Sequence, residues 1–298
     1  MFGESHVLPL PLRSINTCKV KQMADFRFIP VTPHPFLNPY VAKIDLFESS
    51  GRLPAQERKL IVPNANFKLT FTCRNGIVAG IGDKTFIQAE NKLSLTGLID
   101  SPVILDSHED APTDTIIIEL KPFGAYRFFN LSYAEVTNQI VGLSDLIGNR
   151  AGELQSQLVD ANSITLKVQL LQKFLIKQLE KTVADPIYDY CIDRILGTDG
   201  LLTVAQLERE TGYSSRWLHR KFSEHLGTGP KNLSEIVRFR QFYHAYSAGV
   251  KPQNLKEHIY HYYHDQSHFI RAFKRFTGST PTDLRNSTNE LSTKHYRG

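Results

Sequence analysis

The chain has 298 residues, of which 41% are hydrophobic and 22% are charged, and only three are cysteines. This length has room for two domains, while the wide spacing of Cys18, Cys73 and Cys191 argues against a disulfide framework and against a zinc finger. The first residues lack the plan of a signal peptide, and no apolar run approaches the roughly eighteen residues that span a membrane. We therefore expect a soluble, cytoplasmic protein without membrane contact.

The net charge of +5 is unevenly placed along the chain. Residues 1–185 hold 19 Lys and Arg against 19 Asp and Glu, so the whole excess falls in residues 186–298. Eight of the eleven histidines lie there too. A basic segment joined to a neutral one is typical of a nucleic-acid-binding module attached to a second domain.

Short apolar or alternating runs dominate the first 130 residues. Residues 67–73 alternate, Arg74-Asn75-Gly76 indicates a turn, and residues 77–81 continue as a second run. Residues 115–120 contain three consecutive isoleucines, which predicts a strand buried on both faces. This half is predicted to be a β-rich sandwich or barrel. It carries no acid pair, metal triad or glycine-rich phosphate loop, so we expect no catalytic residue, no metal and no cofactor.

The sequence period changes to a helical one from about Ser132. Residues 143–159 and 164–179 are predicted to be helices, with Leu166, Leu170 and Phe174 on one side of the second. These three side chains fit a core or an interface better than a ligand site. The helices have three open roles: packing on the β structure, bridging to the next domain, or pairing two subunits.

A stretch of about fifty residues occurs twice near the end of the chain. A constant offset maps the first copy onto the second, so that two apolar anchors, an arginine, a glycine and a proline recur in register. The matched pairs are Leu218 with Phe269, Arg220 with Arg271, Phe222 with Phe273, Gly227 with Gly278, and Pro230 with Pro281. Two copies are too few for a solenoid, so this pattern indicates a duplicated module.

Each copy has the pattern of a helix-turn-helix. In the first, Thr203 and Gln206 form a capping box, Gly212 suits the turn, and Ser214 can cap the next helix. Leu218, Phe222 and Leu226 would then face the core, as Phe269 and Phe273 would in the second copy. The opposite faces carry arginine, glutamine and serine, which hydrogen-bond base edges and phosphates in a major groove.

The segment from about 186 to 286 resembles the DNA-binding domain of the AraC/XylS family of bacterial transcription regulators. The strongest motif is Asp265-Gln266-Ser267-His268-Phe269, continued by Ala272-Phe273-Lys274-Arg275-Phe276, Gly278 and Pro281. The resemblance implies two units, about 203–226 and 254–277, joined by a helix over 231–247 that Pro230 opens. It also implies reading helices about 34 Å apart on one face of the duplex.

Carried over position by position, the base contacts of the family fall on Arg216 and Arg220 in the first unit. In the second they fall on Gln266, Ser267 and Arg271. The full set of expected DNA-binding residues is Ser214, Ser215, Arg216, Trp217, His219, Arg220, Gln266, Ser267, His268, Ile270, Arg271 and Lys274.

The sequence thus predicts an α+β chain of two domains. Residues 1–185 would be a β-rich regulatory, effector-binding or dimerisation domain ending in helices, and residues 186–298 an all-α DNA-binding domain of two helix-turn-helix units. The expected function is that of a non-enzymatic transcription regulator, of the activator class, that binds promoter or operator DNA. RNA polymerase is the expected protein partner, and a small-molecule effector and a homodimer stay open.

Two alternatives remain. The β-rich half could be an enzyme with a reactive cysteine and a DNA-docking tail, although no cysteine has an activating motif. The chain could also be a protein-interaction module, because the second unit has Tyr262 or Tyr263 where the family has a turn glycine.

Two residue sets have a plain structural interpretation beside a functional one. His258, His261, His264 and His268 have helical spacing, but the motif places a turn through them, so packing or phosphate contact is favoured over a metal site. Trp217 is predicted to support its helix rather than to stack on a base.

Overall fold

The computed structural model describes residues 26–52, 60–247, 257 and 259–285. Its first half contains the predicted strands, and the alternating runs at 67–73, 77–81 and 115–120 are each confirmed as one strand. The strands are β1 (Phe26–Val31), β2 (Val41–Ser49), β3 (Leu60–Ile61), β4 (Phe67–Arg74), β5 (Ile77–Ile81), β6 (Lys84–Gln88), β7 (Leu93–Thr96), β8 (Val103–Ser107), β9 (Thr113–Leu120) and β10 (Ile140–Gly142).

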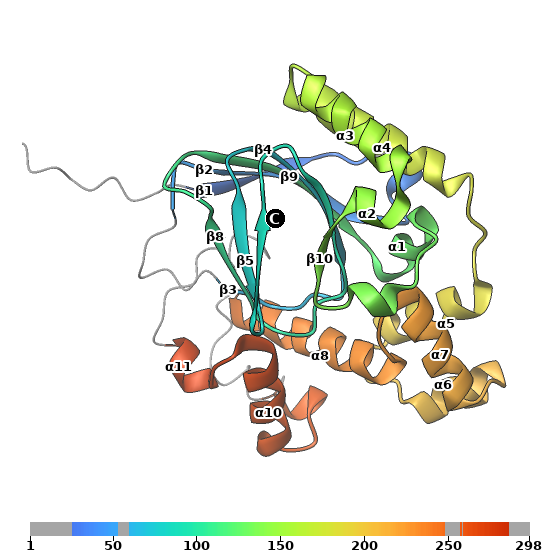
Figure 1. The fold of residues 1–298 in the computed structure, drawn as a ribbon. Helices are drawn as coiled ribbons and strands as arrows, with labels where there is room; N and C mark the ends of the chain where they lie inside the picture. Colours follow the sequence, from blue (N-terminus) through green and yellow to red (C-terminus); the bar gives the residue numbers. More distant parts are fainter. Residues whose placement is uncertain (1–25, 53–59, 248–256, 258, 286–298) are drawn as a thin grey trace, which may run out of the picture.

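The strands form two antiparallel sheets that face each other (Figure 1). One sheet has the order β1-β2-β9-β4-β7-β10, and the other has the order β3-β8-β5-β6. The predicted turn at Asn75-Gly76 passes the chain from the first sheet to the second. Asn75 has a φ of 55°, and its side-chain amide donates to the carbonyl oxygens of Glu109 and Ala111. The two sheets confirm the prediction of a β-rich sandwich or barrel.

Strand β9 is buried on both faces, as its isoleucines predict. Ile116 and Ile118 belong to the main hydrophobic cluster, which extends to the helices. Ile117 points the opposite way and packs between the sheets with Phe47 and Ile77. Successive side chains of a strand alternate between faces, so one strand can serve both layers.

In this half of the chain, helices lie between strands along the sequence and after the last strand. They are α1 (Pro122–Phe128), α2 (Leu143–Ile147), α3 (Asn149–Asp160) and α4 (Ile164–Leu179), with short 3₁₀ turns η1 (Pro35–Leu37) and η2 (Tyr133–Val136). The single helix expected over 143–159 is wrong, because Gly148 adopts a φ of 66° and divides it into α2 and α3. Helix α1 has no counterpart in the sequence prediction.

The buried side of α4 differs from the expected one. Val168, Leu171 and Leu175 are buried, whereas Leu166 is 39% exposed. Leu170 and Phe174 are half-buried against the core. The apolar face of α4 is therefore wider than one packing surface, and its Leu166 edge reaches solvent.

The second half of the chain is helical, as predicted. Its helices are α5 (Pro186–Gly197), α6 (Val204–Thr211), α7 (Ser215–Leu226), α8 (Pro230–Ser247), α10 (Gln266–Thr277) and α11 (Pro281–Arg285). Figure 1 shows α8 running beneath the sheets between the group α5–α7 and α10. Both Pro230 and Pro281 stand at the first position of their helices, where proline is tolerated.

The two halves of the described chain pack directly on each other. One continuous hydrophobic cluster includes Phe67 and Tyr133 from the first half and Tyr188, Phe222 and Phe239 from the second. The first half thus contacts the helices that carry the expected reading residues. The domain boundary at residue 185 stays a prediction.

Candidate nucleic-acid interface

The first helix-turn-helix has the local geometry that its sequence predicts. Thr203 and Gln206 form both bonds of a capping box at the start of α6. Gly212 ends the helix with a φ of 74°, a left-handed conformation that glycine adopts without steric cost. Ser214 then caps α7 by accepting a hydrogen bond from the Trp217 amide at 3.3 Å. The turn between α6 and α7 is fixed by these residues.

Helix α7 has one buried and one exposed face. Leu218, Phe222 and Leu226 are fully buried. On the other side Ser214, Ser215, Arg216, His219 and Arg220 are exposed, so the expected base and phosphate contacts of the first unit lie on one accessible face.

Trp217 lies between these two faces. It is half-buried and packs on the core, and its ring stacks on Tyr213 with centroids 4.0 Å apart. Lys221 lies over the same indole at 5.6 Å. These contacts agree with a supporting role, and Tyr213, which the sequence analysis did not single out, is part of that support.

The second unit repeats this arrangement. Asp265 caps α10 by accepting a hydrogen bond from the His268 amide at 2.7 Å. Phe269 and Phe273 are buried as predicted, and Phe276 joins them. The exposed residues of α10 include the expected contacts Gln266, Ser267, Ile270, Arg271 and Lys274. His268 is half-buried with its ring against Tyr263, so its side chain contributes to packing.

The turn of the second unit is built without glycine. Tyr263 occupies the place of Gly212 and has no positive φ among the described residues, so its backbone does not need glycine. Its amide donates to the Ile259 carbonyl at 2.8 Å, and its buried ring packs against Phe269. Residues 259–262 are helical, whereas 254–256 of the expected helix lie outside the described residues. In the second unit, a buried tyrosine of the core therefore takes the place that the turn glycine has in the first unit.

Helix α8 connects the units through aromatic packing, as expected. The Phe239 ring lies 4.9 Å from Phe276, and the Phe242 ring lies 4.7 Å from Phe269. Val237 is also buried, and Tyr246 stacks near Phe242. The position of α10 is therefore set by α8.

The first half of the chain contacts both units. At the end of α7, Thr137 donates a hydrogen bond to the Gly227 carbonyl at 2.9 Å. At α10, Arg275 binds the Asp100 carboxylate at 2.9 Å, and Asn232 of α8 donates to the same carboxylate at 3.0 Å. No local sequence pattern predicts these contacts, because they join residues more than 80 positions apart.

A hollow of about 640 Å³ lies beside the exposed face of α7. Arg216, His219 and Arg220 line one side of it, and Ser132 and Ala134 line the other. The β-rich half therefore borders the face that carries the expected reading residues.

The described residues bear on the other interpretations as well. They contain no group of three or more His, Cys, Asp and Glu placed to hold a metal, and His258 lies outside them. Burial raises the pKa of the Cys73 and Cys191 thiols to about 11, the opposite of an activated nucleophile. Within the same residues, no helix combines the length and the apolar character that crossing a bilayer requires.

Several solved structures are similar to the chain. ToxT from Vibrio cholerae strain SCE256 is 13% identical, with 84% of this chain and 96% of ToxT covered and a TM-score of 0.44. The AraC-like transcriptional activator CuxR is 13% identical, with 76% of this chain and 88% of CuxR covered and a TM-score of 0.28. EutQ from Clostridium difficile is 6% identical, with 32% of this chain and 68% of EutQ covered and a TM-score of 0.24. No curated protein matches the sequence.

Two protein families match parts of the sequence. Residues 30–142 match a domain of unknown function (DUF6597), which spans most of the two sheets. Residues 207–287 match a helix-turn-helix domain, which spans most of α6 and all of α7, α8 and α10. This match coincides with the duplicated units and with the DQSHF motif at the start of α10. Residues 207–287 therefore carry a helix-turn-helix domain, in agreement with the AraC-type DNA-binding domain that this segment resembles.

Proposed function

We propose that this regulator reads two consecutive major-groove segments, one with α7 and one with α10. The observation that carries the proposal is the equivalence of the two units. Gly227 and Gly278 end their helices with φ values of 85° and 69°, and Pro230 and Pro281 start the next ones. Both reading helices present polar and basic residues on the side away from the core. Two such helices on one rigid connector suit a site that spans about 34 Å of DNA.

The roles within each helix follow from residue type and exposure. Each of the three arginines, Arg216, Arg220 and Arg271, would form two hydrogen bonds with the edge of one guanine. Gln266 would form two with the edge of an adenine. The small hydroxyl residues, His219 and Lys274 would hold phosphates and set the register. Ile270, 38% exposed, suits a thymine methyl group. The half-buried Trp217 and His268 support these side chains from behind.

The β-rich half is the proposed control domain, spanning residues 1–185. It contacts the end of α7 at Gly227 and α10 at Arg275, so a change within it can alter how both reading helices are placed. We expect no enzymatic activity, since neither described thiol is activated. RNA polymerase and a second copy of the chain are the further partners we expect.

The proposal is tested by fluorescence anisotropy on DNA from upstream of the protein's own gene, with a shuffled duplex as competitor. Arg220→Ala and Arg271→Ala should each cost about 1–3 kcal/mol and relax base preference at one position. Lys274→Ala should instead lower the slope of the salt dependence by about one, with base preference unchanged.

Arg150→Ala is the matched control, because Arg150 is an exposed arginine on α3, away from both reading helices. It should leave affinity and preference unchanged. Equal weakening on native and shuffled duplexes by Arg220→Ala would identify that arginine as a phosphate contact. Wild-type protein that does not prefer the native duplex would contradict the proposed function.

A further inference from the structure

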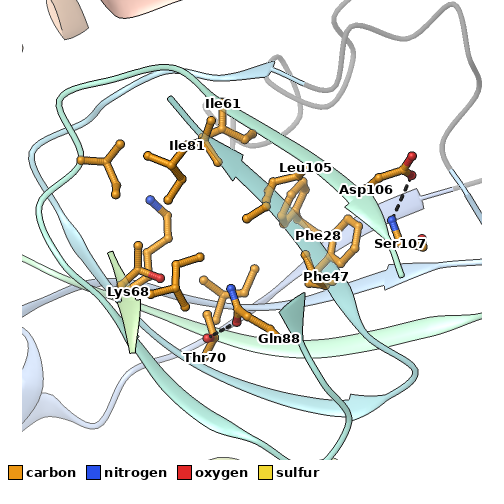
Figure 2. Close-up of a pocket in the computed structure, with 17 residues that line it drawn as sticks. Phe28, Phe47, Ile61, Lys68, Thr70, Ile81, Gln88, Leu105, Asp106 and Ser107 are labelled. Atoms are coloured by element: carbon orange, nitrogen blue, oxygen red, sulfur yellow. Dashed lines mark hydrogen bonds between the residues drawn. The ribbon is translucent and has the colours of Figure 1, made fainter. Parts of the chain in front are cut away.

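A cavity lies between the two sheets, and its lining residues do not include any residue of the reading helices. Its volume is about 80 Å³. Phe28, Phe47, Ile61, Ile81 and Leu105 contribute to a lining that is almost entirely apolar (Figure 2). Apolar cavities with such linings exclude water and accept small apolar molecules.

Two charged residues, Lys68 and Asp106, are part of this lining. Figure 2 shows the ammonium group of Lys68 pointing into the cavity from β4. Burial lowers the pKa of Lys68 below 10.5, an effect that Glu119 opposes and Lys43 reinforces. Lys68 is half-buried. Withdrawing a charge from water without a matched partner is costly, so this position is unfavourable for the lysine unless a negative charge joins it.

Glu119 stands directly opposite Lys68 in the pairing of β4 with β9, so its carboxylate is the nearest negative charge on the same face of the sheet. Glu119 is the carboxylate that acts on it most strongly, but Glu119 accepts hydrogen bonds from Asn64 at 3.0 Å and Asn66 at 2.9 Å. Lys43, in contrast, pairs with Asp45 at 3.0 Å. Within the described residues, the side chain of Lys68 forms neither an ion pair nor a hydrogen bond.

A second polar group faces the same space. Gln88 on β6 lines the cavity and uses its carbonyl oxygen to accept a hydrogen bond from Thr70 at 2.6 Å. Its amide nitrogen points toward the cavity (Figure 2). The cavity thus presents two nitrogen donors against an apolar wall, whereas the Asp106 carboxylate is turned aside to accept from the Ser107 amide.

We propose that this cavity binds a monocarboxylate with a compact apolar body, an aromatic ring or a short alkyl chain, whose carboxylate pairs with the Lys68 ammonium. The apolar walls take the body of the ligand, and the Gln88 amide offers a second donor. Buried ion pairs are favourable when each charge is matched and hydrogen-bonded, which the ligand supplies here.

The position of the cavity gives such a ligand a route to the DNA-binding half. Ile99 and Val103 line the cavity, and Asp100 between them binds Arg275 of α10. This step rests on the proposed function, because it makes the monocarboxylate the effector of the control domain. The binding itself does not depend on DNA.

Isothermal titration calorimetry of the full chain tests the site, with hexanoate and benzoate as probes and hexanamide as the neutral control. Wild-type protein should bind hexanoate or benzoate at least about tenfold more tightly than hexanamide, since a charge-assisted hydrogen bond is lost with the amide. Equal affinity for hexanoate and hexanamide, or no binding of either carboxylate, would overturn the proposal.

Lys68→Met keeps the length of the side chain and removes its charge. It should weaken hexanoate about tenfold or more and leave hexanamide unchanged. Lys84→Met, at an exposed lysine of β6, is the matched control and should change neither. Ala79→Leu, which fills the cavity from β5, should abolish both.

Hexanoate affinity retained in Lys68→Met would contradict the role of the lysine. If that variant does not fold by circular dichroism, the comparison of hexanoate with hexanamide on wild-type protein still decides the proposal. Because calorimetry uses no DNA, a failure here is distinct from a failure of operator binding.

Discussion

Gly227 has two separate reasons to be glycine. Its φ of 85° lies in the left-handed region, and a Cβ there would stand 2.5 Å from the Tyr133 carbonyl oxygen and also overlap Thr137. Gly212 has a similar φ of 74°, but a Cβ there would meet nothing within 4 Å. The pair therefore separates the cost of backbone conformation from the cost of close approach between the two halves.

Gly212→Ala should lower the free energy of unfolding by about 1–2 kcal/mol, the cost of a left-handed alanine. Gly227→Ala should lower it by about 1–3 kcal/mol more, because η2 must move away. Urea denaturation followed by circular dichroism measures both. Equal losses would mean that α7 does not rest on η2 in solution.

Lys68 illustrates what sequence patterns miss at the level of single residues. The alternation of Phe67, Leu69 and Phe71 correctly predicts that Lys68 faces the opposite side of β4. In a sheet with one solvated face, that side is exposed to water. Here the sheet of β3, β8, β5 and β6 covers it, and a pattern within one strand carries no information about a second sheet.

Helices α5 and α7 are joined through one carboxylate. Asp185 caps α5 and pairs with Lys221 of α7 at 2.8 Å, and His225 of α7 lies 3.1 Å from the same oxygen. Burial raises the pKa of Asp185, but the hydrogen bonds from Lys221, the Tyr188 amide and His225 outweigh it and hold the pKa below 3.8. An acid with a lowered folded pKa stabilises the protein above its unfolded pKa.

This stabilisation should be complete at neutral pH and be lost as the pH falls from about 4 through the lowered folded pKa. Asp185→Asn keeps a capping oxygen but loses the ion pair. It should be less stable than wild type at pH 7, and the difference should shrink below about pH 4. Denaturation midpoints between pH 7 and pH 3 measure this. Asp193→Asn, at an exposed acid of α5, should show no such convergence.

Elements with strong local signals could be predicted from the sequence, and those fixed by distant contacts could not. Strands β4, β5 and β9, the capping box of α6 and the DQSHF start of α10 all carry their pattern within a few residues. The break at Gly148 was missed because an isolated glycine is tolerated within a helix pattern. Helix α1 was missed because its seven residues, starting at Pro122, are too few to show a period.

At the scale of the whole molecule, the two halves are linked near the cavity. Asp100 lies between Ile99 and Val103, which line the cavity, and it accepts hydrogen bonds from Arg275, Asn232 and Asn138. Arg275 also binds Glu235 of α8 at 2.7 Å. One arginine of the second reading helix therefore has a partner in each half, and these two partners can be removed separately.

If the cavity ligand controls DNA binding through this contact, hexanoate and operator DNA must change each other's affinity by the same factor. Asp100→Asn keeps the shape of the side chain and removes the charge that holds Arg275 across the two halves. Partly exposed ion pairs contribute about 0.2–1 kcal/mol. The factor by which hexanoate and DNA change each other's affinity (the mutual factor) should therefore move toward one by roughly 1.4- to 5-fold. Anisotropy with and without hexanoate, and calorimetry with and without DNA, measure the two sides of this coupling.

Glu235→Gln is the matched control, because it removes the other partner of Arg275 within the DNA-binding half. It should leave the mutual factor unchanged, even where it shifts DNA affinity itself. A factor that stays the same in Asp100→Asn would show that the signal does not pass through residues 99–103. The contact between Thr137 and Gly227 would then be the next described link from the first half to a reading helix, and Gly227→Ala would be the variant to test in the same coupling.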